Sequence, residues 1–519
     1  MAKRVNLDAM IPREDFGLTD VDQSIDLIKD FPLTNLESES PIRRLLRKPD
    51  FQRETYHWTP EQVVTFIASF VDSEVIPSLI LWKSPSFIFV IDGGHRLSAL
   101  RAWVEDDYGD GAISQQFYHG EITEDQKKIA KRTRQLIEEK IGRYSALKAL
   151  VGQKLVDDPV KAKRAGQMFT RTMALQWVLG TQEVAETSFF KINSQGTPLD
   201  AIEELLIKSR KKPIAISARA ILRAGYGHKY WSKFAADKQA AIETTAADLF
   251  KILFRPEIDS PLKTLDVPVG GSVSPVEALS LLIEFLTVTG SKSQAKITTI
   301  DDYPDDDTGD ETIAMLNRSL EISGRITGNG PGSLGLHPAV YFYNEKGKHN
   351  RFLLLGLVAL VAEKIRNNDG GWFKKFTKVR AVVEKFLVAD KSVISVLPSN
   401  LSRAQRIPKM RDMFAFLVTE ADKGVALTPE SLIAHLGLTG RFIDVRSIQT
   451  TPHVNDDAKS EAFIQKAIGS ALTCPICAGL LDTGKSISYD HAKRVREGGT
   501  GDVTNVQLSH PYCNTGYKN

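Results

Sequence analysis

The feature that most restricts how this chain can fold is a pair of short half-sites near its C-terminus. Cys474 and Cys477 are separated by two residues, and His510 and Cys513 repeat this spacing. The chain has only three cysteines, all of them in these half-sites, and an odd number argues against a disulfide framework. Two such pairs on separate loops supply the four nitrogen and sulfur ligands of a tetrahedral zinc ion. We therefore expect a structural zinc site whose four positions are all filled by the protein.

Side chains suited to catalysis lie between and just after the half-sites. In chain order these are Asp490, His491, Gly498, Gly499, Asn505 and Asn514. This order resembles the HNH nuclease family, in which a strand ends in Asp-His, a Gly-Gly turn and an Asn follow, and a Cys-Asn pair lies on a terminal helix. The resemblance covers residues 474–519. His510 departs from it, because many members have cysteine there, but histidine is also a zinc ligand.

The resemblance implies a role in phosphodiester hydrolysis for each polar residue of the set. His491 would be the general base that takes a proton from water, because an imidazole titrates near neutrality. Asp490 and Asn514 would hold Mg²⁺ or Mn²⁺ through oxygen atoms. Asn505 would orient the loop that carries His491.

A second motif lies at a predicted strand-to-helix turn near the N-terminus. Residues 87–91 are apolar and partly β-branched, which predicts a buried strand, and helical spacing of apolar residues resumes at Leu97. The turn between them consists of Asp92, Gly93, Gly94, His95 and Arg96. Glycines at such a turn let backbone N–H groups approach a ligand, and the start of the helix favours phosphate.

With Gln52-Arg53 upstream and Asn193 downstream, this motif resembles domain of unknown function 262, the Asp-Gly-Gln-Gln-Arg family, over residues 30–205. The resemblance implies a ParB-like core, occurrence in modification-dependent and phosphorothioate-sensing restriction proteins, and a nucleoside triphosphate as ligand. The candidate nucleotide-site residues are then Gln52, Arg53, Asp92, Gly93, Gly94, His95, Arg96 and Asn193. Gly94 and His95 replace the two glutamines of the family motif, so hydrolysis of the nucleotide stays open. A turn that merely packs the sheet stays an alternative.

The length of 519 residues predicts several domains. We expect an α+β protein with three parts: a ParB-like α/β sensor or nucleotide-binding domain over 1–210, a mainly helical domain over 211–455, and a zinc-bound HNH module of the ββα-metal type over 456–519. The apolar run 352–362 predicts a buried helix, since a membrane span needs about 20 residues. The polar residues 450–460 are expected to form a linker.

Charge and targeting signals exclude two classes of protein. The formal net charge is only +3, so a strongly basic DNA-coating protein is excluded, and contact with nucleic acid must come from local patches. The first residues show no secretory signal, and we expect no membrane association and a cytoplasmic location.

Together the two motifs predict a metal-dependent DNA endonuclease that is regulated by its N-terminal domain and restricts phage or modified DNA. The expected cofactors are structural Zn²⁺, catalytic Mg²⁺ or Mn²⁺ and a nucleoside triphosphate, and the expected partner is DNA, with a homo-oligomer left open. Two alternatives remain: a DNA-binding regulator with a non-cutting zinc module, and a homing-type mobile nuclease. The presence of Asp490, His491 and Asn514 together favours an enzyme, because a binding module needs no base beside a metal site.

Overall fold

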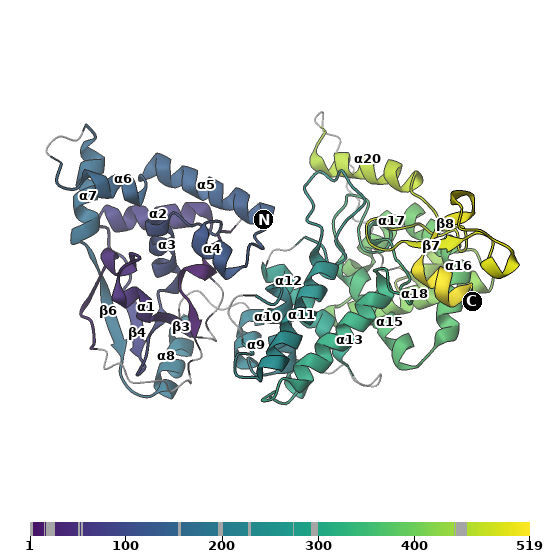
Figure 1. The fold of residues 1–519 in the computed structure, drawn as a ribbon, viewed down its shortest axis with the longest axis horizontal. Coiled ribbons are helices and arrows are strands. Elements are labelled where there is room, and N and C mark those ends of the chain that lie inside the picture. Colours follow the sequence, from purple (N-terminus) through teal and green to yellow (C-terminus); the bar gives the residue numbers. More distant parts are fainter. Residues whose placement is uncertain are drawn as a thin grey trace. The chain divides into compact units, whose positions relative to one another are not determined.

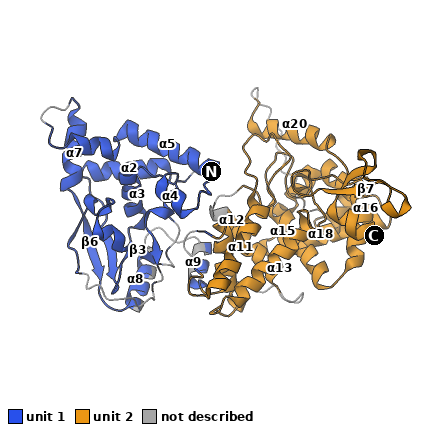
Figure 2. Ribbon diagram, viewed as in Figure 1, with its two compact units in different colours: residues 1–210, 226–230 blue, residues 211–225, 231–519 orange. Residues whose placement is uncertain are grey.

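The computed structural model of the chain contains two compact units (Figures 1 and 2). Unit 1 consists of Met1–Arg210 and Tyr226–Tyr230, and unit 2 of Lys211–Gly225 and Trp231–Asn519. The residues that the structure describes are 4–14, 16, 26–49, 52, 55–153, 157–195, 201–226, 230–272, 275–291, 299–440, 442 and 454–518. Within these ranges no helix combines the length and the apolar character that a membrane span requires.

Unit 1 is built on a six-stranded mixed sheet with the strand order β1-β3-β5-β4-β6-β2. The strands are β1 (Arg13–Glu14), β2 (Asp30–Pro32), β3 (Leu46–Pro49), β4 (Leu79–Lys83), β5 (Ile88–Asp92) and β6 (Thr172–Val178). The pairs β1–β3, β3–β5 and β4–β6 are parallel, whereas β4–β5 and β2–β6 are antiparallel. The strands β4 and β5 therefore form a hairpin in the middle of the sheet.

Strand β5 is buried on both faces, which explains its unbroken apolar sequence. Ile88 and Val90 belong to the core that also contains apolar residues of α2 (Pro60–Val71) and α3 (Gly94–Glu105). Phe89 and Ile91 belong to a second cluster, with residues of α8 (Gln182–Gln195). Because side chains alternate along a strand, a strand covered on both faces needs an apolar residue at each position. The predicted strand and the helix that follows it are confirmed.

The other helices of unit 1 are α1 (Pro41–Leu45), α4 (Ala112–Phe117), α5 (Glu124–Lys140), α6 (Tyr144–Leu150), α7 (Pro159–Thr170) and α9 (Ala201–Lys208).

Helix α2 begins with a capping box. The backbone N–H of Gln62 donates to Thr59 Oγ1 at 3.3 Å, and the backbone N–H of Thr59 donates to Gln62 Oε1 at 2.9 Å. These two bonds satisfy N–H groups that would otherwise lack a partner at a helix start.

Most of unit 2 is helical. Its helices are α10 (Pro213–Leu222), α11 (Ala236–Phe254), α12 (Pro275–Gly290), α13 (Asp310–Ile326), α14 (Pro338–Tyr341), α15 (Arg351–Arg366), α16 (Gly370–Ala389), α17 (Lys391–Val396), α18 (Arg406–Asp422), α19 (Pro429–His435) and α20 (Asp456–Gly469). The apolar run 352–362 lies in α15, which packs along α18 in the helical core, as predicted.

The prediction of a linker over residues 450–460 is wrong for the second half of this range. Helix α20 begins at Asp456, and the side chain of Asn455 caps it by accepting the backbone N–H of Ala458 at 2.9 Å. An Asn cap followed by acidic residues in the first turn is a helix start, and polar composition alone concealed it. Residues 450–453 lie outside the described residues.

The C-terminal segment of unit 2 contains β7 (Ser488–His491), β8 (Val506–Ser509) and a final helical turn over Cys513–Tyr517. The two strands pair antiparallel. This segment packs on the glycine-rich loop that follows α13: Tyr512 N donates to Ser333 O at 2.8 Å, and Gly328 N donates to Ser486 Oγ at 2.8 Å. The chain is thus a mixed α/β protein, as predicted in outline. The separation of 456–519 from the helical part stays a prediction.

Candidate functional site

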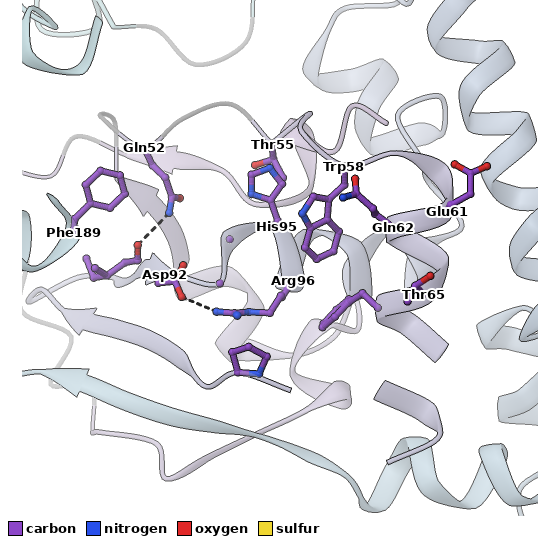
Figure 3. A pocket seen from close by; sticks show the side chains of 15 residues that line it. Gln52, Thr55, Trp58, Glu61, Gln62, Thr65, Asp92, His95, Arg96 and Phe189 are labelled. Carbon is purple, nitrogen blue, oxygen red and sulfur yellow. Dashed lines mark hydrogen bonds and ion pairs between the residues drawn. The ribbon is translucent and has the colours of Figure 1, made fainter. Parts of the chain in front are cut away.

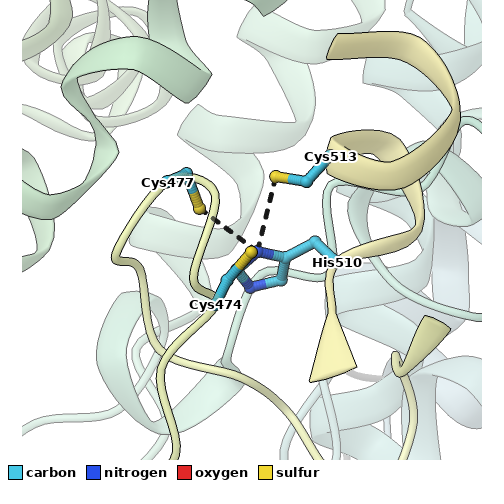
Figure 4. A group of neighbouring side chains, drawn as sticks. All are labelled: Cys474, Cys477, His510 and Cys513. Atoms are coloured by element: carbon cyan, nitrogen blue, oxygen red, sulfur yellow. Dashed lines mark hydrogen bonds between the residues drawn. The ribbon is translucent and has the colours of Figure 1, made fainter. Parts of the chain in front are cut away.

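The four predicted zinc ligands form one buried cluster (Figure 4). The ligand atoms of Cys474, Cys477, His510 and Cys513 all lie within 4.8 Å of one another. His510 Nδ1 is 3.3 Å from Cys477 Sγ and 3.7 Å from Cys513 Sγ. Around a tetrahedral zinc with Zn–S bonds of about 2.3 Å, the ligand atoms are separated by about 3.8 Å, so this arrangement fits the ion. Among the described residues, these four form the one group of histidine, cysteine and acidic side chains placed so that it could hold a metal ion.

The ionisation of the cluster also fits a divalent cation. Hydrogen bonds from Cys477 and Cys513 lower the pKa of the Cys474 thiol, and the same contact with Cys474 raises the pKa of Cys477 to about 11. Protein groups alone therefore favour only one thiolate. Burial lowers the pKa of His510, which keeps the imidazole neutral, as a metal ligand must be. A divalent cation would let all three thiols ionise together.

A buried ion pair on helix α16 anchors the first half-site. His510 Nε2 donates to the carbonyl oxygen of Leu480 at 3.0 Å, which sets the ring so that Nδ1 faces the sulfur atoms. The backbone N–H of Leu480 in turn donates to Glu384 Oε2 at 2.6 Å. Glu384 Oε1 pairs with Arg380 Nε at 2.6 Å, and both side chains are almost fully buried. Arg380 and Glu384 thus hold the loop that positions His510, and the sequence analysis missed them.

The charges of this pair are balanced only while both partners are present. Burial by itself lowers the pKa of Arg380, but the charge of Glu384 outweighs it and raises that pKa. Arg380 also donates to the carbonyl oxygens of Leu334 at 2.5 Å and Gly335 at 2.9 Å, in the loop after α13. The ion pair therefore ties three segments of unit 2 to one another.

We expect Glu384→Ala to lower the free energy of unfolding of unit 2 by about 3–5 kcal/mol, because it leaves the buried Arg380 without a counter-charge. Glu420→Ala is the matched control: Glu420 pairs with Lys423 at 2.8 Å on the surface of α18, and its loss should cost less than about 1 kcal/mol. Denaturant unfolding of the full chain measures both. Equal, small losses in the two variants would show that the buried pair does not anchor this region.

Strand β7 carries the predicted catalytic pair at its end, as the sequence indicates. Asp490 is buried, and its Oδ2 accepts hydrogen bonds from Gln507 Nε2 at 2.9 Å and Lys518 Nζ at 2.7 Å. Lys518 also donates to the carbonyl oxygen of His491 at 2.6 Å. The imidazole of His491 is partly exposed and makes no hydrogen bond to a described residue, so its nitrogen atoms are accessible to water. Lys518 and Gln507 are further residues that sequence reasoning missed.

Asn505 occupies the position that its predicted role requires. Its Oδ1 accepts the backbone N–H of Lys493 at 2.7 Å, and its Nδ2 donates to the carbonyl oxygens of Lys493 at 3.0 Å and Thr500 at 2.7 Å. The side-chain amide of Asn505 thus links the two ends of the loop that follows His491. Gly499 is required there, because a Cβ atom would lie 1.9 Å from the carbonyl oxygen of Lys493.

The two residues expected to bind Mg²⁺, Asp490 and Asn514, both carry oxygen atoms of the type that this ion prefers. Asp490 Oδ1 accepts no hydrogen bond from a described residue and is available to a cation. Asn514 Nδ2 donates to Ser488 Oγ at 2.9 Å and to the carbonyl oxygen of Tyr489 at 3.2 Å, which places this amide beside the same strand. Mg²⁺ is commonly held by one or two protein oxygens and several waters. Such an ion would share Asp490 with the ammonium group of Lys518.

The N-terminal motif lines a pocket of ≈ 550 Å³ in unit 1 (Figure 3). Its lining includes Gln52, Trp58, Asp92, Gly93, Gly94, His95, Arg96 and Phe189. Gly93 has φ +97°, and a Cβ atom there would lie 2.4 Å from Leu79 Cδ2, so only glycine fits this position. Helix α3 begins at the next residue, and in the described part of the chain no side chain caps it.

Arg96 is partly engaged by its own motif. Its Nη2 donates to Asp92 Oδ2 at 2.7 Å and to the carbonyl oxygen of Ser78 at 3.1 Å, whereas its Nε has no hydrogen-bond partner in the described part of the chain. Gln52 lies behind the turn and is held by donating to the carbonyl oxygen of Val90 at 3.1 Å. Gln52 Oε1 is buried and accepts no bond from a described residue. Both residues line the pocket, and each keeps one buried polar atom that bonds to no described residue.

His95, the next residue of the turn, packs among aromatic rings. Its ring centroid is 5.7 Å from that of Trp58 and 5.6 Å from that of His57. Figure 3 shows the His95 and Trp58 rings side by side on one wall of the pocket. Of the remaining predicted residues, Arg53 and the side chain of Asn193 lie outside the described residues, and only the backbone of Asn193, in α8, is placed.

The range of the N-terminal domain is matched by a known family. Residues 33–210 match the family described as GmrSD restriction endonuclease, N-terminal domain. This GmrSD match includes the turn Asp92–Arg96 with β5 before it and α3 after it, and it nearly coincides with the range 30–205 inferred from the sequence. The helical part of unit 2 and the Cys3His segment lie outside the match. Searches among curated proteins and among solved structures found no match.

Proposed function

We propose that this chain is a metal-dependent DNA endonuclease of the restriction type, with its cutting centre at Asp490 and His491 and a nucleotide or nucleic-acid phosphate site in the pocket of unit 1. The observation that carries the proposal is the end of β7, where a buried carboxylate and an accessible imidazole follow one another on a strand that pairs with β8, the strand leading into His510. The family match over residues 33–210 supports the class of substrate, because the family is described as a restriction endonuclease.

At the cutting centre, the accessible ring of His491 accepts the proton of the attacking water. Asn505 closes the loop after His491 through the backbone of Lys493 and Thr500, and so fixes the backbone next to the base. The ammonium of Lys518 contacts both Asp490 and the carbonyl oxygen of His491, which fixes their relative position. A divalent cation bound at Asp490 and Asn514 would supply electrostatic stabilisation of the phosphate charge.

In unit 1, the uncapped start of α3 and the guanidinium of Arg96 favour a phosphate group. The ring of Trp58 offers a flat surface on which a base can stack. Control of cutting by this pocket requires that its ligand shift a conformational equilibrium that the cutting centre shares.

One contact favours the DNA-binding regulator over the nuclease. Lys518 Nζ lies 2.7 Å from Asp490 Oδ2, and a lysine that permanently neutralises Asp490 would keep a cation out. In that case the module would bind DNA and would not cut it, with or without Mg²⁺.

The experiment that tests the proposal is cleavage of modified and unmodified phage DNA by the full chain, with Mg²⁺, in the presence and absence of each nucleoside triphosphate. Cutting that needs Mg²⁺ supports the nuclease, and dependence on a nucleotide separates it from a homing-type nuclease. Binding without cutting under all conditions would favour the regulator.

We expect Arg96→Ala to weaken nucleotide binding by about 10- to 100-fold, the loss typical of one charge-assisted hydrogen bond of 1.5–3 kcal/mol, and to change the nucleotide dependence of cutting. Arg164→Ala is the control in the same unit: Arg164 pairs with Asp72 at 2.7 Å on the surface and should leave binding unchanged. Calorimetric titration with ATP, GTP, CTP and UTP measures the effect. If no nucleotide binds the wild type and Arg96→Ala discriminates DNA normally, the turn only packs the sheet.

A further inference from the structure

A second cavity, of ≈ 300 Å³, lies in unit 2 between the N-terminal ends of α15 and α18. It is lined by His349, Asn350, Arg351, Phe352, Ser395, Pro398, Ser399 and Arg406. Neither the Cys3His cluster nor the end of β7 contributes a residue to it. The start of α15 is capped by Asn350, whose Oδ1 accepts the backbone N–H groups of Phe352 and Leu353, so the charge at this opening comes from the side chains of Arg351 and Arg406.

Two guanidinium groups share one aromatic ring in this cavity. Arg351 Cζ is 4.7 Å and Arg406 Cζ is 5.0 Å from the ring centroid of Phe352. Arg406 Nε donates to the carbonyl oxygen of Leu401 at 3.3 Å, and its two terminal nitrogens bond to no described residue. Arg351 donates to Ser280 Oγ at 2.9 Å. The ring therefore holds two like charges close together while several of their donors stay unused.

The acidic side chain that faces these arginines does not balance them. Glu284 Oε2 is 3.7 Å from Arg351 Nε, beyond hydrogen-bonding distance. Burial raises the pKa of Glu284, and Arg351, Arg403 and Arg406 act together to lower it. The lining of the cavity itself includes the two arginines Arg351 and Arg406 and no acidic side chain.

We propose that this cavity binds a phosphate group of the DNA backbone and so holds the duplex on unit 2. Guanidinium forks match phosphate oxygens geometrically, and they stay charged at any working pH. A chain with a net charge of +3 needs local positive sites to hold DNA. The choice of DNA as the source of the phosphate rests on the proposed nuclease function, since the proposed cutting strand belongs to the same unit.

The test is duplex binding by the full-length chain over 50–200 mM salt, with wild type, Arg406→Glu and the double variant Arg351→Ala/Arg406→Ala. Each lost phosphate contact should lower the slope of log K against log salt by about 0.9, for all duplex sequences alike. Arg406→Glu is included because it reverses the charge of a guanidinium whose terminal nitrogens bond to no described residue, and the alanine double variant tests the same site without adding a carboxylate. Arg411→Ala, on the same helix, is the control, since Arg411 is already paired with Asp412 at 2.8 Å.

Separate arms contain inorganic phosphate or ATP in place of the duplex. Unchanged slopes and affinities in both variants would overturn the proposal, as would a wild type that binds no duplex. Loss of phosphate or ATP binding alone would show that the site takes a free anion and not DNA. Wild type that binds DNA through these arginines but never cuts it would overturn the proposed nuclease and leave this site standing, whereas cutting with unchanged slopes would do the reverse.

Discussion

His491→Ala should reduce DNA cleavage by about 10²- to 10⁴-fold, the usual contribution of a general base. The imidazole at the end of β7 makes no hydrogen bond to a described residue, so its removal breaks no structural contact there. It is not among the four clustered ligands. Zinc content and DNA binding should therefore stay near the wild-type values. Single-turnover cleavage of phage DNA with Mg²⁺ measures the loss.

The control for this variant is His435→Ala, which removes a histidine of the same unit that stacks on Phe416 with a centroid distance of 4.1 Å. This variant should cut at the wild-type rate. Asp490→Ala and Asn514→Ala should raise the Mg²⁺ concentration that half-maximal cutting requires, as well as slowing it. If His491→Ala cuts as fast as wild type, the residue has no part in the mechanism.

Cys477→Ser should reduce bound zinc from one ion per chain to almost none and unfold the C-terminal segment. The free energy of binding a structural zinc, about 10–16 kcal/mol in small zinc domains, is also folding free energy. Unit 1 has its own hydrophobic core and should stay folded. Metal analysis together with limited proteolysis of the purified chain separates the two effects.

Ile476→Val serves as the matched substitution, because it lies between the two cysteines and removes one methylene group without touching a ligand. It should keep its zinc and its resistance to protease. Wild-type protein that was never exposed to chelator and yet contains no zinc would refute the site. A Cys477→Ser variant that retains a full equivalent of zinc would show that the ion is bound elsewhere.

Short-range patterns predicted most of the local structure correctly. The apolar run 87–91 becomes β5, and Asp490-His491 end β7. Each of these depends on neighbours a few residues apart, where capping, side-chain alternation and turn geometry operate. The same holds for the two half-sites, because a spacing of two residues already places both members of each pair on one side of a tight loop.

The sequence by itself determined which residues could become ligands, caps, strands and a base, since these depend on residue type and spacing. Only the tertiary structure decided what surrounds them. Arg380 and Glu384 have the i, i+4 spacing of an ordinary surface pair. In the folded protein both side chains are buried, and Glu384 accepts the backbone N–H of Leu480. Lys518 lies far along the chain from Asp490, and the glycine-rich loop after α13 carries no motif. Lys518 and this loop could not be recognised from the sequence, because burial and long-range contacts depend on how distant segments pack. The spacing of residues along the chain does not determine that packing.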